Sequence, residues 1–458
     1  MTESAHVLPF NPFHALPNPP AALYADSFVG ISPYEFTNWR DETVSWKTTC
    51  YLHAGLNPTD TYVVKGPDAL DFLARATVTN MDNFGVGRIK HGICCDAKGR
   101  IVVDGVMMRT AEDEVTTYWM MPLVDFALST KRYGDYDVEG EVLTGKVYLF
   151  QIGGPASIDV LEAATGESLR DIPHLGFRDS QIAGRKVRVC RVGMAGTLAY
   201  EVHGPIEDAI EVYQAIWEAG APLGMRRLGS HCYPMNHAEN GFPQYGVHFL
   251  EPRSEVPGLA EYLKTEPGMQ YQLFTFDNCW IPFGSACGDK ANFFHNPFEL
   301  GWGRMIRFDH EFEGREALEA IRDADARHIV TLEWDADDVA EVFRSQFLGT
   351  DEVPYKFIDH PSDCDFWAPS LSVSHDYVLD GDGNKVGFSF GRQNAEYFRR
   401  MISIATLDTQ LAVEGTEVFV LWGEPGTRQK KIGAKVARYP YNNVLRSSTT
   451  DVNALPKR

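Results

Sequence analysis

Residues 193–220, with the sequence GMAGTLAYEVHGPIEDAIEVYQAIWEAG, show the pattern on which the expected fold depends. Residues 198–203 are typical of a strand, Gly204-Pro205 of a turn, and residues 206–219 of a helix, because proline suits the first positions of a helix. One face of this helix is apolar, as expected for a helix on a core. That face carries Ala209, Ile210, Tyr213, Ile216 and Trp217.

The same order of strand, glycine–proline turn and helix occurs twice earlier in the chain. Residues 62–73 contain one such unit, and residues 147–164 contain another. Repeated units of this kind, with hairpins between them, predict an α+β fold with split βαβ packing.

The helical period fades after about residue 328. Strands are expected over 328–334, 401–407, 416–422 and 432–439, and residues 380–384 are expected to form a hairpin loop. This alternation predicts a separate, β-rich C-terminal domain, a small barrel or sandwich.

We therefore divide the chain into three parts. Residues 1–21 contain five prolines and are expected to form an extended arm, residues 22–327 two interleaved α+β domains, and residues 328–458 the β-barrel-like domain. Within the second part, residues 252–268 contain three prolines and two glycines. We expect them to form a surface excursion, and they are a candidate lid.

Composition excludes several classes of partner. Of the 458 residues, 42 are Lys or Arg and 63 are Asp or Glu, so the formal net charge is −21. Such an acidic chain repels phosphate backbones and anionic lipids, so we expect no binding to nucleic acid or to a membrane. The first basic residue is Arg40, and the eight cysteines form no CxxC pair, which favours a cytoplasmic protein with reduced thiols.

Familiar metal and phosphate motifs are absent or incomplete. Asp380, Asp382 and Asn384 occupy the first positions of a calcium loop, but Lys385 and Gly391 stand where that loop needs glycine and a bidentate glutamate. No P-loop, no GxGxxG after a strand, no HExxH and no GxSxG occurs. We therefore predict no metal site.

Four segments of the chain form a recognisable pattern. In order, they are 34–40 (YEFTNWR), 193–201 (GMAGTLAYE), 229–239 (GSHCYPMNHAE) and 296–302 (NPFELGW), and the last is followed by FEGREAL at 312–318. Together they resemble the aminomethyltransferase (glycine-cleavage T-protein) superfamily, over about residues 22–440. Within it, the tetrahydrofolate-dependent aryl-ether O-demethylases of the vanillate and 3-O-methylgallate type and the sesamin-type methylene transferases are most similar. The resemblance implies a three-domain clover-leaf, with a β-rich C-terminal domain, around a tetrahydrofolate site.

The resemblance also assigns cofactor-binding roles. Glu201 matches an acidic residue on the pterin ring, and a carboxylate has two acceptors for the adjacent donors of a pterin. Gln151 matches a folate-contacting glutamine, with a structural role as the equal alternative. Phe242 aligns with a tryptophan that lies near the cofactor in the demethylases. Trp302 is a further candidate for the wall of the cofactor site, or else a core residue.

Two residues are candidates for catalysis. Tyr233 matches the tyrosine proposed as acid or base, and its ordinary pKa of about 10 is close to that of a phenol leaving group; the alternative is a packed tyrosine. Asp104 is a candidate orienting group near the folate or else a turn residue. The first aspartate of the glycine-cleavage pair aligns with Val103, which argues against aminomethyl transfer.

The substrate pocket is expected to include Met120, Trp119 and Tyr245. Met120 aligns, without gaps, with the arginine that holds a substrate carboxylate, and Gly55 and Pro58 align near polar pocket residues. Since a buried carboxylate needs a cationic partner, these exchanges predict a neutral aromatic ether as substrate.

The resulting hypothesis is a tetrahydrofolate-dependent C1 transferase that cleaves an aryl ether. We favour methylene transfer from a methylenedioxyphenyl group of a sesamin-like lignan, which gives a catechol and 5,10-methylene-tetrahydrofolate. The alternatives are an O-demethylase that gives 5-methyl-tetrahydrofolate, a glycine-cleavage-like aminomethyltransferase and a non-catalytic folate-binding protein. The sequence leaves the oligomeric state open.

Overall fold

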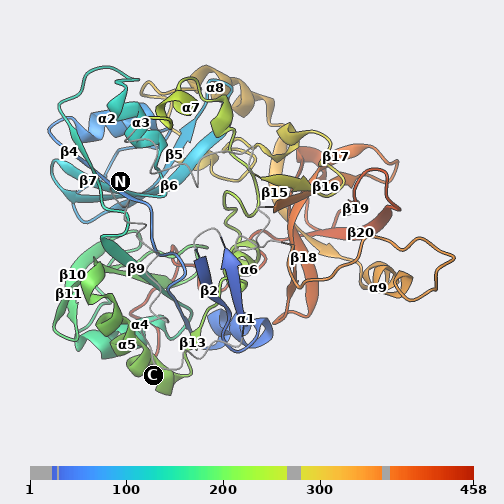
Figure 1. The fold of residues 1–458 in the computed structure, drawn as a ribbon, viewed down its shortest axis with the longest axis horizontal. Helices are drawn as coiled ribbons and strands as arrows, with labels where there is room; N and C mark the ends of the chain where they lie inside the picture. Colours follow the sequence, from blue (N-terminus) through green and yellow to red (C-terminus); the bar gives the residue numbers. More distant parts are fainter. Residues whose placement is uncertain (1–22, 28–29, 266–279, 364–371, 458) are drawn as a thin grey trace, which may run out of the picture.

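The computed structural model describes residues 23–27, 30–265, 280–363 and 372–457. Three β-sheets, each with its own helices, lie around the short central helix α6 (Cys232–Asn240) (Figure 1). The expected arm at residues 1–21 lies outside the described residues. At the start of the described chain, β1 (Leu23–Ser27) and β2 (Gly30–Glu35) form an antiparallel hairpin.

The first α+β unit is built on a five-stranded sheet in the order β5-β6-β7-β4-β8. Helices α2 and α3 pack on it through apolar side chains such as Phe72, Leu73 and Phe126. Gly66, with φ 143°, makes the turn before α2, as the glycine–proline signal predicts. The elements are β4 (Thr61–Lys65), α2 (Ala69–Ala76), β5 (Ile89–Cys95), β6 (Ile101–Ala111), β7 (Glu114–Tyr118), α3 (Leu123–Ser129) and β8 (Glu139–Val142).

The second unit is built on a six-stranded sheet in the order β10-β11-β12-β9-β3-β13. The expected apolar face of helix α5 (Ala209–Gly220) is confirmed only in part. Val212, which was not expected on this face, is fully buried, whereas Ile210 and Trp217 are half-buried. The elements are α1 (Trp39–Thr48), β3 (Tyr51–His53), β9 (Val147–Gly153), α4 (Ser157–Thr165), β10 (Phe177–Ile182), β11 (Arg185–Cys190), β12 (Ala199–Pro205), α5 (Ala209–Gly220) and β13 (Arg226–Arg227).

The C-terminal unit is a closed barrel. Six strands follow one another in the order β16-β17-β18-β15-β20-β19, and β16 also pairs with β19, which closes the ring; β14 adds to the outside of β16. Closure leaves fewer unpaired strand edges. The elements are β14 (Ile281–Phe283), β15 (Arg327–Trp334), α9 (Ala336–Ser345), β16 (Ser372–Leu379), β17 (Lys385–Ala395), β18 (Arg400–Asp408), β19 (Glu417–Trp422) and β20 (Lys430–Ala437).

The predicted hairpin loop at residues 380–384 joins β16 to β17. The Asp380 carboxylate accepts the backbone N–H groups of Asp382 (3.0 Å) and Asn384 (2.8 Å). It stabilises the turn in this way. In the parts of the chain that the structure describes, no group of three His, Cys, Asp or Glu side chains could hold a metal ion.

The expected surface excursion at 252–268 is corrected for residues 252–265. This segment contains α7 (Leu259–Tyr262), and Val256, Leu259 and Leu263 are buried in the core of the five-stranded unit. The Tyr262 hydroxyl also donates to Asp125 on α3 (2.9 Å). The segment packs because its apolar side chains face α3, so it is an integral part of the domain. Residues 266–268 lie outside the described residues.

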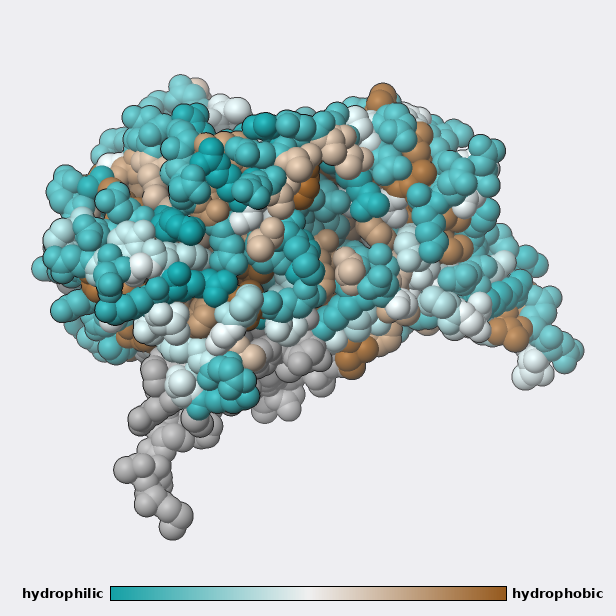
Figure 2. Space-filling model, turned by 90° about the horizontal axis from the view of Figure 1, so that it is seen from above, coloured by the Kyte–Doolittle hydropathy of each residue, from teal (hydrophilic) through white to brown (hydrophobic). Residues whose placement is uncertain are grey.

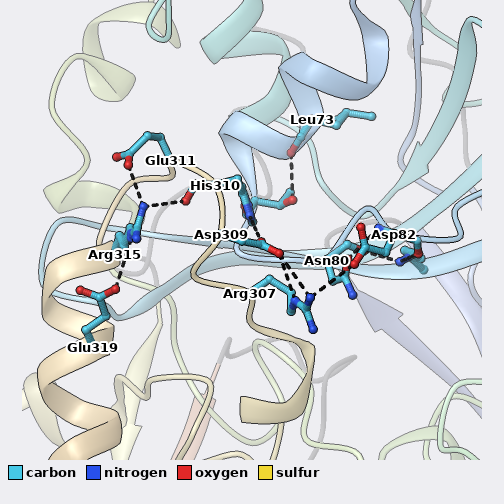
Figure 3. A network of polar contacts seen from close by, with 11 residues as sticks. Leu73, Asn80, Asp82, Arg307, Asp309, His310, Glu311, Arg315 and Glu319 are labelled. Atoms are coloured by element: carbon cyan, nitrogen blue, oxygen red, sulfur yellow. Dashed lines mark hydrogen bonds and ion pairs between the residues drawn. The ribbon is translucent and has the colours of Figure 1, made fainter.

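Residues 303–315 connect the five-stranded unit with the rest of the protein. Backbone bonds join Asn80 N–H to the Met305 carbonyl (3.2 Å) and Arg307 N–H to the Val78 carbonyl (3.1 Å). A charged network follows the same path into α8 (Arg315–Ala324) (Figure 3). Its charged members are Asp82, Arg307, Asp309, His310, Glu311, Arg315 and Glu319. The segment is therefore held firmly beside the loop at 77–82.

The chain returns from the barrel to the six-stranded unit. Val452 is buried in the core of that unit, and Arg170 donates to the Leu455 carbonyl (3.0 Å). Arg191 donates to the carbonyls of Ser447 (3.1 Å) and Thr450 (2.6 Å). The segment 443–457 therefore belongs spatially to a domain whose strands come more than two hundred residues earlier.

The outer surface exposes both polar and apolar side chains. One face is mostly hydrophilic, with smaller hydrophobic patches scattered over it (Figure 2). Within the described ranges, no helix is both long enough and apolar enough to cross a bilayer. The six cysteines in these ranges, Cys50, Cys94, Cys95, Cys190, Cys232 and Cys287, are free.

Candidate active site

A cavity of about 600 Å³ lies where the two α+β units, α6 and the returning C-terminal segment meet. Glu201 and Tyr233 both line it, as do Asp104, Phe242 and Trp302. Most of the predicted site residues therefore share one cavity. The structure brings them together from strands, a helix and loops that are far apart in the sequence.

The row of polar side chains behind the cavity follows from strand register. His53 on β3 pairs with Gln151 on β9, and Gln151 pairs with Glu201 on β12. Side chains directly opposite one another on adjacent strands point to the same face of a sheet. The Gln151 amide donates to Glu201 Oε1 (3.3 Å), and the Tyr51 hydroxyl donates to Gln151 Oε1 (2.9 Å). Gln151 itself is fully buried and positions Glu201 from behind.

The second carboxylate oxygen of Glu201 faces a histidine. His203 Nε2 lies 3.1 Å from Glu201 Oε2, and His203 Nδ1 lies 3.0 Å from the Tyr118 hydroxyl. Because a carboxylate only accepts, Nε2 carries the hydrogen, and Nδ1 accepts from Tyr118. Burial raises the pKa of Tyr118, which keeps it a donor. Glu201 is thus fixed in orientation and keeps lone pairs for a ligand in the cavity.

Tyr233 projects from α6 toward the same row. Its ring stacks on His53 with 5.1 Å between centroids and lies 4.8 Å from the ring of His237. Burial raises the pKa of Tyr233; a hydrogen bond with the Gln244 side chain opposes this rise, and the negative charges of Glu201 and Asp104 add to it. The hydroxyl is therefore protonated at neutral pH and can donate to an oxygen in the cavity.

The buried polar atoms on the cavity wall that find no hydrogen-bond partner among the described residues include two acceptors, His237 Nε2 and Gln244 Oε1. His237 Nδ1 donates to the Phe242 carbonyl (2.8 Å), and burial lowers the pKa of His237 to about 4, so Nε2 is an acceptor. Together with Glu201, these acceptors fit the amino and N–H donors of a reduced pterin.

Asp104 lies on β6 and is held by a histidine. His91 Nε2 is 2.8 Å from Asp104 Oδ2, and the His91 ring meets Trp302 edge-on at 4.8 Å and Phe242 at 5.3 Å. Phe242 and Trp302 are themselves 5.4 Å apart. The two aromatic rings, tilted by 33° to each other, therefore form an apolar wall beside an oriented carboxylate.

The predicted substrate residues separate into two groups. Trp119 and Tyr245 line the cavity, and so do Gly55 and Pro58. Met120 does not belong to the lining; it is fully buried in the core of the five-stranded unit, against Gly92 and Gly105. Trp119 has φ 65°, a conformation rare for a bulky residue, which turns consecutive side chains in different directions. The argument for a neutral substrate from Met120 therefore fails.

An arginine elsewhere on the wall bears on substrate charge instead. Arg253 lies over the Tyr245 ring (4.4 Å), and its guanidinium forms an ion pair with the buried Glu251 (2.6 Å). Asp60 lines the same part of the cavity and interacts with Arg253. Two carboxyl groups thus accompany one guanidinium, which leaves little positive charge for a substrate carboxylate.

Another part of the cavity wall is cationic. Lys90, Arg304 and Arg446 line it together with His174. Arg446 donates to the carbonyls of Ala195 (3.2 Å) and Asn240 (2.6 Å), and burial with Arg304 nearby lowers its pKa. Burial and the neighbouring arginines lower the pKa of His174 to about 4. This region suits an anionic group.

Sequence reasoning missed several of these residues. His203 could have been found, because residues two apart on a strand share a face and Glu201 had already been singled out. His91 is paired with Val106 in the β5–β6 hairpin, and Asp104, two residues before Val106, lies diagonally from His91 on the same face, so the hairpin register predicts that they are close. Asp60 and Arg253 lie in loops, and no local pattern marks them.

Comparisons with known proteins show what the chain is similar to. A family model described as the GCVT N-terminal domain matches residues 34–252. A sesamin methylene transferase from Sinomonas sp. (strain No.22) is 41% identical over 445 residues, which cover 96% of each chain. A syringate O-demethylase from Sphingobium sp. (strain NBRC 103272 / SYK-6) is 30% identical over 446 residues, which cover 92% of each chain.

A solved structure shows the same fold. The glycine cleavage system aminomethyltransferase T from Bartonella henselae superposes with a TM-score of 0.66 at 16% identity. The superposition covers 94% of this chain and 97% of that one. The expected α+β fold of the aminomethyltransferase type, with a β-rich C-terminal domain, is confirmed.

Proposed function

The chain belongs to the GCVT aminomethyltransferase family, a family of tetrahydrofolate-dependent one-carbon transferases, and from this we propose that it cleaves an aryl ether of a neutral aromatic substrate. We further propose that the carbon is the methylene group of a methylenedioxyphenyl ring. The products are then a catechol and 5,10-methylene-tetrahydrofolate. The relative at 41% identity, named for sesamin, supports methylene transfer.

One observation carries the proposal: Glu201 and Tyr233 line one cavity. A carboxylate with free lone pairs suits the pterin, and a protonated phenol suits the oxygen that leaves carbon. A cavity that held only one of them would support binding without turnover. Their shared cavity therefore favours an enzyme over a folate-binding protein.

Several further residues are suited to hold tetrahydrofolate. Glu201, His237 Nε2 and Gln244 Oε1 offer acceptors, and Phe242 and Trp302 offer aromatic surface. The cationic region with Lys90, Arg304 and Arg446 suits the carboxylates of the glutamate tail. When bound, tetrahydrofolate supplies the two nitrogens that accept the carbon.

The protein's own contribution is positioning and proton donation. Tyr233 is fixed by the stack on His53 and is protonated at neutral pH, so it can protonate an aryl oxygen as the bond to carbon breaks. Holding two reactants in one enclosed cavity lowers the barrier further, because their encounter no longer costs translational entropy during the reaction.

Charge around Arg253 supports a substrate without a carboxylate. Arg253 is paired with Glu251, and Asp60 adds a second acid beside it. A benzoate placed there would find the guanidinium already paired with Glu251. In contrast, a neutral ether loses little when it leaves water.

A second candidate is O-demethylation of a methoxyarene, which gives 5-methyl-tetrahydrofolate. The syringate O-demethylase at 30% identity favours it. Aminomethyl transfer has less support, since Val103, which aligns with an aspartate of the glycine-cleavage enzymes, is a fully buried apolar residue.

Product analysis tests the proposal. The protein is incubated with tetrahydrofolate and matched methylenedioxy- and methoxyarenes, each with and without a carboxylate, and mass spectrometry identifies the folate product. We expect 5,10-methylene-tetrahydrofolate from the neutral methylenedioxyarene. Formation of 5-methyl-tetrahydrofolate alone would establish the second candidate. A preference for the carboxylated arenes would contradict the inference about substrate charge.

A further inference from the structure

Methylene transfer and methyl transfer differ in how many protons they move. From a methylenedioxyarene, two C–O bonds break and two C–N bonds form, and each C–O electron pair stays on its oxygen. The two hydrogens displaced from the folate nitrogens end on the two catechol oxygens. From a methoxyarene, one such exchange is sufficient. A methylene transferase thus has two oxygens to protonate, and Tyr233 is fixed at a single position on α6.

Asp60 is positioned by a rigid turn just before β4. The Thr59 hydroxyl donates to the Leu56 carbonyl (2.9 Å), and the Thr61 hydroxyl donates to the Thr59 carbonyl (2.8 Å). The Asp60 carbonyl accepts the Trp119 N–H (3.0 Å), which extends the β4–β7 pairing by one residue. The backbone is therefore fixed on both sides, and the Asp60 side chain lines the cavity beside Trp119.

The carboxyl of Asp60 is the least engaged of the acids on the cavity wall. Glu201 interacts with Gln151 and His203, and Asp104 is held by His91 at 2.8 Å. For Asp60, no side-chain hydrogen bond is found within residues 23–27, 30–265, 280–363 and 372–457. Both of its oxygens are thus available to a ligand.

The surroundings of Asp60 set its protonation near neutrality. Burial raises the pKa of Asp60 to about 6, and the Arg253 guanidinium opposes this rise. Arg253, from the turn at 253–255, is the charged group facing Asp60; it is itself paired with Glu251 and lies over the Tyr245 ring. A group with this pKa exchanges protons readily at pH 6 to 7.

We propose that Asp60 is a second proton-transfer residue, which protonates one oxygen of the methylenedioxy ring while Tyr233 protonates the other. The inference rests on the methylene transfer proposed above. In its acid form Asp60 gives its proton to the oxygen as the C–O bond breaks. As a carboxylate it then takes up one of the hydrogens displaced from the folate nitrogens. The carboxyl thus returns to its starting form, and no oxidant or reductant is needed.

The first test compares Asp60→Asn with Asp60→Glu on a neutral methylenedioxyarene. Asparagine keeps the shape but cannot transfer a proton, so kcat/KM should fall by about 10²-fold or more, and glutamate should restore part of it. The wild type should lose activity as pH rises above about 6, because the acid form is lost. Asp60→Asn should lack this dependence. Asp113→Asn, an exposed change in the β6–β7 turn, is the matched control.

A binding measurement gives a second readout that needs no turnover. The catechol product is titrated into the folate-free protein and followed by calorimetry. Above pH 6 the Asp60 carboxylate can accept a catechol hydroxyl, so binding should tighten with pH in the wild type and weaken by about tenfold in Asp60→Asn. Thermal melting of each variant confirms that it is folded.

The outcomes separate the two proposals. If the wild type forms methylene-tetrahydrofolate and Asp60→Asn keeps its rate and pH profile, only the role of Asp60 is overturned. If Asp104→Asn instead removes the pH dependence, the second proton belongs to the His91–Asp104 pair and Asp60 is again excluded. If the wild type forms only 5-methyl-tetrahydrofolate, the proposed methylene transfer fails, and the need for a second proton fails with it.

Discussion

Glu201 illustrates how one carboxylate is prepared for a ligand. Gln151 and His203 each donate to a different oxygen, and Tyr118 fixes the tautomer of His203. These three donors come from β9, β12 and β7, so the orientation of the carboxylate depends on both α+β units. The ligand meets an acceptor that needs no rearrangement.

Replacing Glu201 by glutamine should weaken tetrahydrofolate binding. Hydrogen bonds to a charged partner contribute about 1.5–3 kcal/mol, so we expect a rise in Kd of roughly 10- to 100-fold. Fluorescence titration measures it. Glu207→Gln, an exposed change two residues after the end of β12 (Ala199–Pro205), serves as the control. Equal affinity in Glu201→Gln and wild type would remove the pterin role.

Replacing Tyr233 by phenylalanine should separate chemistry from binding. The ring and its stack on His53 are kept, but the proton donor is lost, so kcat should fall by about 10²–10⁴-fold. The Kd for tetrahydrofolate should change by less than about threefold. Steady-state kinetics measures kcat, and titration measures the Kd for tetrahydrofolate. Unchanged kcat would show that Tyr233 is a packing residue.

His53 should make stability depend on pH. Its Nδ1 donates to the Leu228 carbonyl (2.9 Å), and burial lowers the pKa of His53 to about 4. Between pH 6.5 and 4 the unfolded chain binds a proton at this residue and the folded chain does not. The residue therefore costs nothing above pH 6.5 and destabilises the fold as pH falls, by up to about 3 kcal/mol at pH 4.

The measurement is the free energy of unfolding of wild type and His53→Asn at pH 7 and pH 4.5. The asparagine variant should lose less stability than the wild type between the two pH values. A loss of equal size in both proteins would show that His53 does not titrate in this way.

At the scale of elements, helix α6 depends on a buried ion pair. Lys47 on α1 forms an ion pair with Glu239 on α6, and both side chains are at most 6% exposed. Trp46 also donates to Glu239 (2.9 Å), and Phe398 in the β17–β18 turn lies 4.4 Å from the Lys47 ammonium. The helix that carries Tyr233 is thus tied to both neighbouring domains.

Removing one partner of this pair should be costly. Glu239→Ala leaves the buried Lys47 amino group without its carboxylate partner and should destabilise the protein by about 3–5 kcal/mol. The double variant Lys47→Met, Glu239→Leu should lose much less. Urea unfolding of Lys47→Met, Glu239→Leu and the double variant gives the coupling free energy between the two side chains. The exposed pair of Glu261 on α7 and Lys264 just after it is the control, since Lys264→Ala should cost less than about 1 kcal/mol.

The sequence predicted elements well where the signal is local. The strand–turn–helix units at 62–73 and 147–164 correspond to β4–α2 and β9–α4, because glycine and proline restrict the backbone at the turns themselves. Helix α9 and the packing of residues 252–265 were missed. Whether Val256 and Leu259 are buried depends on α3, more than a hundred residues earlier, and no local pattern records that contact.

The site was predictable where a residue's direction follows from strand register. Glu201 faces the cavity as the alternation of β12 requires. Met120 was misplaced because it comes after β7 ends, where the positive φ of Trp119 breaks the alternation. An ungapped alignment predicts which residues are equivalent on the two sides of such a turn, but it does not predict in which direction their side chains point.

At the scale of the whole molecule, the segment 443–457 should stabilise a domain to which it is not adjacent in sequence. Val452 is buried in the core of the six-stranded unit. Val452→Ala should therefore lower the free energy of unfolding by about 1–3 kcal/mol, owing to lost apolar burial and the cavity left behind. Val444→Ala, an exposed change in the same segment, is the control. Thermal or urea unfolding of both variants decides it.

The cavity wall contains residues from Gly55 to Ser448, so its first and last contributors are separated by nearly the whole polypeptide. During synthesis the early domains can fold as soon as they emerge, since translation adds only about 5–20 residues per second. The pocket nevertheless lacks Arg446 and its neighbours until almost the whole chain has been synthesised. A ribosome that stalls in the barrel would release a product with an incomplete cavity, and its six-stranded unit would lack the stabilising contact of Val452.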